Sequence, residues 1–177
     1  ENIVEIIDAE DGTYSTVRVW SPDKLYYSDT NIGYKITRSA DLSAYNEIPI
    51  STFDVSSTLE EWNPKECMLD NNILTRWTSA AQEGEYAWFD FGEAKQVDAV
   101  ALAFWQGDTR NYKYKIEGSN DAENWTVLKE GQSAGETEGY ELMEFNGGSY
   151  RFIKVTGYGS MINRITNILE FRALTKK

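Results

Sequence analysis

The feature that most constrains the fold is a succession of short β-rich runs, each ended by residues that favour turns. Alternation of apolar with polar residues, or an excess of β-branched and aromatic ones, is typical of strands. The runs lie at residues 14–20, 34–38, 86–91, 97–105, 112–118, 125–128, 140–145, 150–156 and 168–174. Turn-forming residues separate them at 71–72, 119–121, 131–139 and 146–148. No window carries a long helical stripe, so the sequence predicts an all-β fold, an antiparallel sandwich or barrel.

The clearest alternation lies in the run at 112–118. It puts Tyr112, Tyr114 and Ile116 on one face and Lys113 and Lys115 on the other. Side chains of a strand alternate between its two faces, so we expect the three apolar residues to face the core and both lysines to face solvent.

Domain organisation follows from the length and from one seam in the pattern. A chain of 177 residues suits one well-cored domain plus an extension, because single domains most often hold about 100–150 residues. The seam lies near residues 44–52, where Pro49 precedes the later pattern. We predict a sandwich over residues 51–177. Residues 1–50 are expected to be an N-terminal extension or the tail of a preceding domain, with no function assigned.

Charge argues against two classes of partner. The formal net charge of −12 repels nucleic acid phosphate and anionic lipid at long range, so we expect neither nucleic acid nor membrane insertion. Screening within about 8 Å at physiological salt still leaves room for a local basic site that holds an acidic sugar.

Composition narrows the chemistry further. The chain has no histidine, which removes the commonest general base and the commonest transition-metal ligand. Its single cysteine, Cys67, excludes an intrachain disulfide. The longest apolar run, at 97–105, is too short to cross a bilayer, and the first residues carry no signal sequence. We therefore expect a water-soluble piece, mature or excised.

Four ordered motifs carry a resemblance to a known family: LDNNILTRW at 69–77, WFDFG at 88–92, SNDAENW at 119–125 and NILEF at 167–171. From residue 51 onward the sequence resembles the coagulation factor 5/8 type C (discoidin-like) domain, above all family-32 carbohydrate-binding modules. The runs AFWQGDTR at 103–110 and VTGYG at 155–159 are most similar to modules appended to alginate and other uronate lyases.

The resemblance implies a galactose-binding-domain-like jelly-roll sandwich without catalytic activity. Such a module would bind a poly- or oligosaccharide and target an attached glycan-degrading enzyme or surface protein to it. It would be secreted, or lie on the bacterial cell surface or in the periplasm, and other domains of a larger protein would be its neighbours.

A cation site is the second implication. Asp70, Asn72 and Thr75 supply a carboxylate, an amide and a hydroxyl, the hard oxygen donors that Ca²⁺ accepts. The resemblance adds the carboxylate of Glu170 and backbone carbonyls that fall on Cys67 and Leu169. The ion would be structural, although sodium or another ion suits the same donors. The alternative is a polar turn without metal.

Sugar recognition needs aromatic faces together with charged or amide groups. The resemblance places the ligand loops at one end of the sandwich. The candidate ligand residues are Trp62, Trp105, Gln106, Asp108, Arg110, Asn111, Tyr158 and Asn163. Arg110 is the first choice as polar anchor, because its guanidinium fork suits a carboxylate or two neighbouring hydroxyls.

Several of these residues also have structural interpretations. Asp108 with Arg110 can be an ion pair that fixes the loop, and Trp105 can end its strand inside the core. Trp62 lies in a polar stretch and suits an exposed platform. The remaining motif tryptophans, Trp77, Trp88 and Trp125, are expected to be structural.

Two other functions stay open. One is an enzyme such as a polysaccharide lyase that uses tyrosine, lysine or arginine for proton transfer, although no catalytic motif is present. The other is adhesion to protein or lipid through apolar loop tips, for which Met161 and Ile162 are the adjacent apolar pair.

Overall fold

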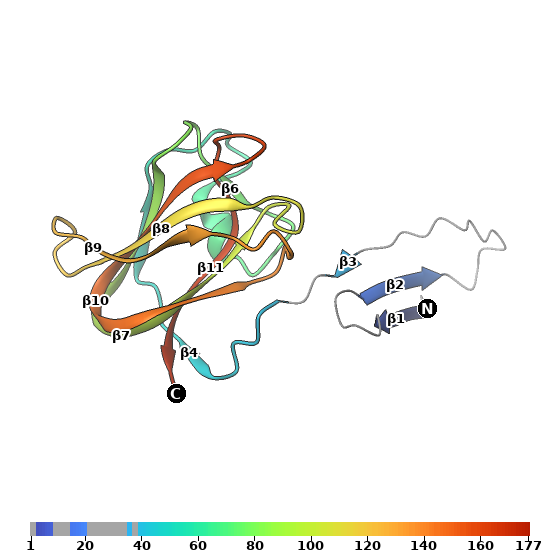
Figure 1. Cartoon of the computed structure of the whole chain (residues 1–177), viewed down its shortest axis with the longest axis horizontal. Helices are drawn as coiled ribbons and strands as arrows, with labels where there is room; N and C mark the ends of the chain where they lie inside the picture. The colour runs from blue at the N-terminus through green and yellow to red at the C-terminus, as the bar shows by residue number, and fades with distance from the viewer. Residues whose placement is uncertain (1–2, 9–14, 21–34, 37–38) are drawn as a thin grey trace. The chain divides into compact units, whose positions relative to one another are not determined.

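The structure is a computed structural model that describes residues 3–8, 15–20, 35–36 and 39–177. The chain divides into two compact units, residues 1–38 and residues 39–177. In the first unit β1 (Ile3–Asp8), β2 (Ser15–Trp20) and β3 (Lys35–Ile36) form a three-stranded antiparallel sheet (Figure 1). The expected runs at 14–20 and 34–38 fall on β2 and β3, with residues 14, 34, 37 and 38 outside the described residues.

The second unit is an antiparallel β-sandwich, as the sequence predicts. Its elements are β4 (Tyr45–Glu47), β5 (Thr52–Val55), the 3-10 helix η1 (Lys65–Leu69), β6 (Trp77–Thr78), β7 (Glu85–Phe104), β8 (Tyr112–Ser119), β9 (Thr126–Gln132), β10 (Glu141–Ser160) and β11 (Asn167–Lys176). The strand order is β4-β11-β7-β10-β8-β9, with β5 also on β7 and β6 on β11. In the described part of the chain no helix is long and apolar enough to cross a membrane.

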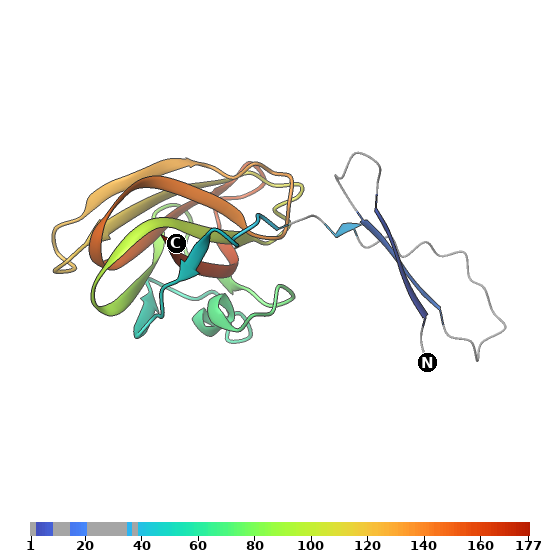
Figure 2. The same cartoon turned by 90° about the horizontal axis from the view of Figure 1, so that it is seen from below.

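Two long strands supply both layers of the sandwich. The first part of β7 pairs with β5 and with the second part of β10, which in turn pairs with β8; the second part of β7 pairs with β11 and with the first part of β10. Both strands bend between these parts (Figures 1 and 2). Gly92 permits the bend in β7 because its φ of 82° is open mainly to glycine.

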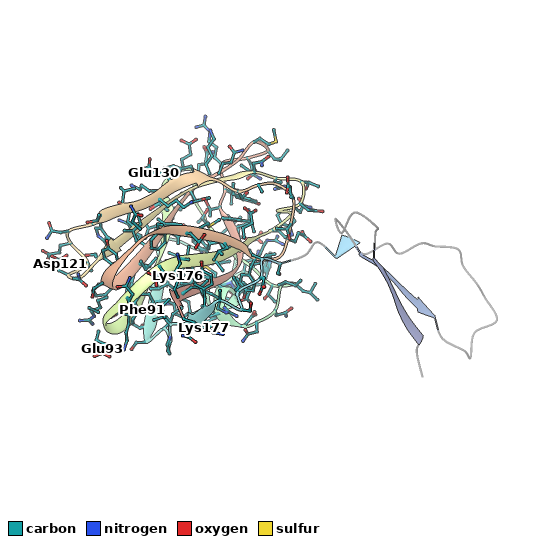
Figure 3. All side chains as sticks on the ribbon, turned by 60° about the horizontal axis from the view of Figure 1, so that its bottom comes forward. Phe91, Glu93, Asp121, Glu130, Lys176 and Lys177 are labelled. Carbon is teal, nitrogen blue, oxygen red and sulfur yellow. The ribbon has the colours of Figure 1, made fainter. Side chains whose placement is uncertain are left out.

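The sequence pattern does not predict that β7 and β10 continue through their bends. It predicts separate runs at 86–91 and 97–105, and again at 140–145 and 150–156, whereas each pair is one strand. Glycines and register shifts allow the pairing of β7 with β10 to continue across the polar residues between the runs. Figure 3 shows Glu93, in the bend of β7, at the same end of this unit as Asp121.

Aromatic stacking organises the core between the layers. The ring of Phe89 lies 3.7 Å from that of Phe171 and 6.0 Å from that of Phe53, centroid to centroid. Trp77 is fully buried, and its indole N–H donates to the carbonyl of Ser57 at 2.9 Å. Each buried aromatic ring contributes about 1.5–3 kcal/mol of hydrophobic stabilisation, so this stack holds β5, β7 and β11 together.

The alternation expected in β8 is present. Tyr112, Tyr114 and Ile116 are buried and Lys113 is exposed, whereas Lys115 is half-buried and paired with Glu117. The period of two therefore identifies the core face of this strand correctly.

The second unit begins ahead of the boundary that the sequence predicts at residue 50. β4 pairs with the end of β11, so that Tyr45 lies opposite Lys176, and Ile48 is buried in the core. Residues 39–50 therefore pack as part of the sandwich. An extension or the tail of a preceding domain stays a prediction for residues 1–38.

Candidate functional site

Segments far apart in the sequence meet where β7 ends and β11 begins. The backbone N–H of Trp105 donates to the carbonyl of Asn167 at 3.4 Å, and that of Thr78 donates to the carbonyl of Asn63 at 3.4 Å. The hydroxyl of Thr78 donates to the Asn167 side chain at 2.8 Å. These bonds tie the segment before η1, strand β6 and the loop after β7 into one surface, the loop end.

Trp105 is the centre of the loop end. The guanidinium carbon of Arg76 lies 4.1 Å from its ring centroid, and that of Arg110 lies 4.6 Å away. A tight turn brings Arg110 back over the ring, because the carbonyl of Gln106 accepts the N–H of Arg110 at 2.9 Å. The Tyr112 hydroxyl donates to the Trp105 carbonyl at 2.9 Å. Two cations are therefore held against one half-buried indole.

Neither guanidinium is neutralised by a carboxylate of residues 39–177. Arg76 donates from Nε to the hydroxyl of Thr78 at 3.2 Å, and Nη1 of Arg110 is buried without a hydrogen-bond partner. A buried unpaired donor costs about 1–3 kcal/mol, and more when charged. In a chain of net charge −12, this arrangement suits an anionic or hydroxyl-rich ligand.

Sequence reasoning missed Arg76. No alternation of faces could have found it, because Arg76 precedes β6, whose two residues, Trp77 and Thr78, are both buried.

Trp62 is the most open aromatic side chain near this surface, with 74 % of its area exposed. It lies next to Asn63, which is buried and bonded to Thr78. Trp105 differs, because arginines lie over its ring. Trp62 is thus the ring with a face free for a sugar, and Trp105 positions the arginines.

The side-chain amides of two predicted ligand residues form hydrogen bonds within the loops. The side-chain N–H of Asn111 donates to the Ser133 carbonyl at 2.9 Å. The side-chain oxygen of Asn163 accepts the N–H of Ile165 at 3.2 Å within the turn between β10 and β11. Both residues help to shape the loop end.

The remaining predicted residues lie around the same loops. Gln106 has a left-handed φ of 52°, and its backbone N–H donates to a carboxylate oxygen of Glu138 at 2.8 Å. Asp108 is half-buried, and no ion pair joins it to Arg110 within residues 39–177. Tyr158 is half-buried near the end of β10. The structure therefore groups Gln106 and Asp108 with Arg110 in one loop, with Tyr158 on a strand.

The predicted cation ligands form a second cluster. Thr75 donates to one carboxylate oxygen of Asp70 at 2.7 Å, and the N–H of Asn72 donates to the other at 2.9 Å. The same N–H also donates to Oε1 of Glu170 at 2.7 Å. Residues almost a hundred positions apart are thus joined, with Asp70 and Glu170 close together.

Glu170 is a fully buried carboxylate. Burial raises its pKa, and the guanidinium of Arg172, 2.9 Å from Oε2, opposes that shift. Burial also raises the pKa of the neighbouring Tyr140 to about 12, with the charge of Arg172 opposing the shift and that of Glu170 adding to it. A cation between the two carboxylates of the cluster would relieve their repulsion.

The two expected backbone ligands flank the cluster. Cys67 lies in η1 with a free, buried thiol, whose pKa is raised by burial. Leu169 is skipped in the pairing of β11 with β7. In residues 39–177 no three acidic, histidine or cysteine side chains are grouped so that they could hold a metal, so a cation here would need amide, hydroxyl and carbonyl oxygens besides the two carboxylates. Such a set fits Ca²⁺, which accepts carboxylate, amide, hydroxyl and carbonyl oxygen alike.

Fold and loop-end geometry define the class as a discoidin-like β-sandwich. The sequence profile of the F5/8 type C domain matches residues 52–171. The chain belongs to the F5/8 type C domain family. No curated protein gives a significant match.

Solved structures refine the comparison. The chain is similar to the family-32 carbohydrate-binding module of AlyQ, solved in complex with 4,5-unsaturated mannuronic acid: 31% identity, TM-score 0.68, 72% of this chain and 97% of that one. A truncated AlyQ with this module and alginate lyase domains gives 30% identity and a TM-score of 0.70 over 75% of this chain and 34% of that one.

A third structure supports the fold alone. The family-32 module of NanJ from C. perfringens, solved with galactose, gives 21% identity and a TM-score of 0.63 over 74% of this chain and 99% of that one. The carbohydrate-binding role is supported by the AlyQ module, at 31% and 30% identity in its two structures.

Proposed function

We propose that this chain is a non-catalytic carbohydrate-binding module whose loop end holds an acidic saccharide. The observation that carries the proposal is the pair of guanidiniums on Trp105, with Nη1 of Arg110 buried and unpaired. A uronate carboxylate supplies the oxygens that such a donor lacks. The AlyQ module, crystallised with an unsaturated mannuronic acid, supports the same ligand class.

Each side chain of the loop end has a different role in sugar recognition. Arg76 and Arg110 provide charged donors that reach a carboxylate or neighbouring hydroxyls. Trp105 fixes both guanidiniums before a ligand arrives, which lowers the entropy lost on binding. Trp62 offers its exposed ring to the apolar face of a pyranose.

A structural Ca²⁺ is the second part of the proposal. The side chains of Asp70, Asn72, Thr75 and Glu170, with the carbonyls of Cys67 and Leu169, would hold it. The ion would neutralise the adjacent carboxylates and tie the loop after η1 to β11. It would stabilise the fold without touching the sugar.

Targeting is the third part. AlyQ carries its module beside alginate lyase domains, and a similar attachment here would bring a glycan-degrading enzyme, or a surface protein, to its polysaccharide. Such a protein would be secreted or lie on the bacterial surface or in the periplasm. Incubation of the chain with alginate, pectin, chondroitin or neutral glycans should release no new chain ends.

The binding test begins with a glycan array in the presence of Ca²⁺, followed by calorimetry on the best acidic hit. Arg76→Ala and Arg110→Ala should each weaken binding by about 1–3 kcal/mol, because hydrogen bonds to charged groups are lost. Arg164→Ala is the matched control, since this exposed arginine is paired with Glu83 in a neighbouring loop. Affinity should fall as salt is added.

Two results would contradict the loop-end site: wild-type affinity in both Arg76→Ala and Arg110→Ala, or an equal loss in Arg164→Ala. A neutral best ligand with salt-independent affinity would refute the acidic class.

Adhesion to protein is the second candidate function. Leu74, Met161 and Ile162 expose 88%, 77% and 63% of their areas, and exposed apolar side chains mark contact surfaces when they gather in a patch. A chain that binds no glycan of the array but loses a protein partner on Met161→Ser would favour this function.

A further inference from the structure

Two hollows on the surface of the sandwich are lined by residues outside the loop end. One lies beside Arg172 and has a volume of about 340 Å³, and the other has a volume of about 270 Å³. The smaller one, the aromatic cavity, is lined by Tyr86, Trp88, Ala122, Trp125, Phe152 and Lys154. None of these residues belongs to the loop end.

Strand register explains why the side chains of the aromatic cavity gather. Trp88 of β7 lies opposite Lys154 of β10, which lies opposite Glu117 of β8. Their neighbours Ala87 and Ile153 are buried in the core, so alternation turns Trp88 and Lys154 outward, whereas Glu117 is itself buried.

A rigid turn supplies the opposite wall. The indole N–H of Trp125 donates to the Ala122 carbonyl at 3.1 Å, and Ala122 has a left-handed φ of 61°. Asp121 accepts the backbone N–H groups of Glu123 and Asn124 at 2.9 and 2.8 Å. Trp125 is thus fixed over the sheet before any ligand arrives.

A charged pair lies among the rings. Nζ of Lys154 is 4.1 Å from the ring centroid of Trp125 and 6.0 Å from that of Tyr86. The same atom is 3.0 Å from a carboxylate oxygen of Glu117, which also pairs with Lys115 at 3.3 Å. Two lysines share one carboxylate, so the cavity offers charged donors beside aromatic faces.

We propose that the aromatic cavity is a second saccharide site, which takes one pyranose ring. Tyr86, 38% exposed, and the half-buried Trp88 and Trp125 present ring surface to the apolar face of a sugar. Lys154 can donate to its hydroxyls, and the buried Glu117, which does not line the cavity, holds Lys154 in place.

The size of the cavity favours this occupant over a protein. Small-ligand sites begin at about 300 Å³, close to the 270 Å³ found here, whereas a stable protein contact covers about 800 Å² on each partner. A single ring held between aromatic walls and a charged pair matches the first case.

Two saccharide sites on one module have a consequence for polymers. When one site holds a polysaccharide, other parts of the same chain are at high effective concentration for the second. The aromatic cavity therefore raises the affinity for polysaccharide above that for a monosaccharide, without a change in the loop end.

The indole N–H signals in ¹H–¹⁵N NMR spectra of the full chain test this proposal. They are assigned through single tryptophan substitutions and followed during titration with galactose, oligomannuronate, oligogalacturonate and chitosan oligomers. At least one sugar should shift the signals of Trp88 and Trp125, and should still do so in a Trp62→Ala, Arg110→Ala variant. Tyr86→Ala should weaken this response about threefold to tenfold, with the more exposed Val127→Ala as control.

The outcomes separate the two sites. Silence of Trp88 and Trp125 with all four sugars would overturn the second site, whatever Trp62 and Trp105 do. Silence of Trp62 and Trp105 would count against the loop end alone. If Tyr86→Ala lowers thermal stability but leaves the shifts of Trp125 unchanged, the cavity is a structural cluster and the proposal is wrong.

Discussion

Substitution of Asp70 provides the sharpest test of the cation site, because hydrogen bonding and ion binding contribute separately. Without an ion, Asp70→Ala removes the hydrogen bonds from Thr75 and from the N–H of Asn72. Two such bonds at an exposed position are worth about 1–2 kcal/mol together. With Ca²⁺ at about a hundred times its dissociation constant, the wild type gains a further amount of about 2.7 kcal/mol.

These free energies translate into melting temperatures. A sandwich of this size shifts by about 2–4 °C per kcal/mol, so chelator should lower the melting temperature of the wild type by about 5–11 °C. Asp70→Ala should melt below the wild type in both conditions, and its own melting temperature should not respond to chelator.

The assay is thermal unfolding followed by near-ultraviolet circular dichroism, with Ca²⁺ or with EGTA. Asp121→Ala is the matched control, because Asp121 also accepts backbone N–H groups in a turn, the one between β8 and β9. It should keep the full response of the wild type to chelator. Equal melting of the wild type with Ca²⁺ and with EGTA would refute the cation site.

Three further predictions concern stability. The pKa of Asp90 is held low by its hydrogen bonds from Arg151. Its contribution to the free energy of unfolding is therefore present above the usual pKa of 3.8 and is lost as the pH falls through the lower folded pKa. Asp90→Asn should flatten this loss of stability in urea unfolding at about pH 2–5. Phe89→Leu removes two ring contacts and should cost about 1–3 kcal/mol, read from the urea midpoint; an unchanged midpoint would contradict the stacking argument. Gly157→Ala would press a Cβ into the side chain of buried Thr166; it should lower the melting temperature, and Thr166→Ala should restore part of the loss.

Much of the fold could be predicted because burial on one face leaves a period of two in the sequence. That signal located β8 and its core residues, and it placed strands on both sides of each bend. It failed at the bends themselves, because Gly92 and the glycines at 147 and 148 let a ladder turn where the residues are polar. The predicted runs also left out β1 and β5, and they missed β4 and β6, whose three and two residues are too few to show a period.

The candidate site was predictable in part for a similar reason. Asp70, Asn72 and Thr75 are close in sequence, and the structure joins them to Glu170. Arg76 was missed because its meeting with Trp105 depends on how β6 and the loop after β7 approach each other, which no local pattern records.

Trp88 and Trp125 were expected to be structural, and that stays a prediction. The structure adds that both are half-buried and line a cavity. A recurring aromatic residue identifies a position that must be filled, but a single ring can pack with one face and leave the other open.

The path of β7 and β10 through both layers also determines when the module folds during synthesis. Their ladder joins residues as distant as Glu85 and Gly157, and contacts of such separation form slowly because a long loop must close first. Until β10 has emerged from the ribosome, β7 has β5 as its partner in one layer and lacks a partner in the other. The module therefore folds late and all at once, and nascent chains that stop before β10 expose the unpaired strand edges that chaperones recognise.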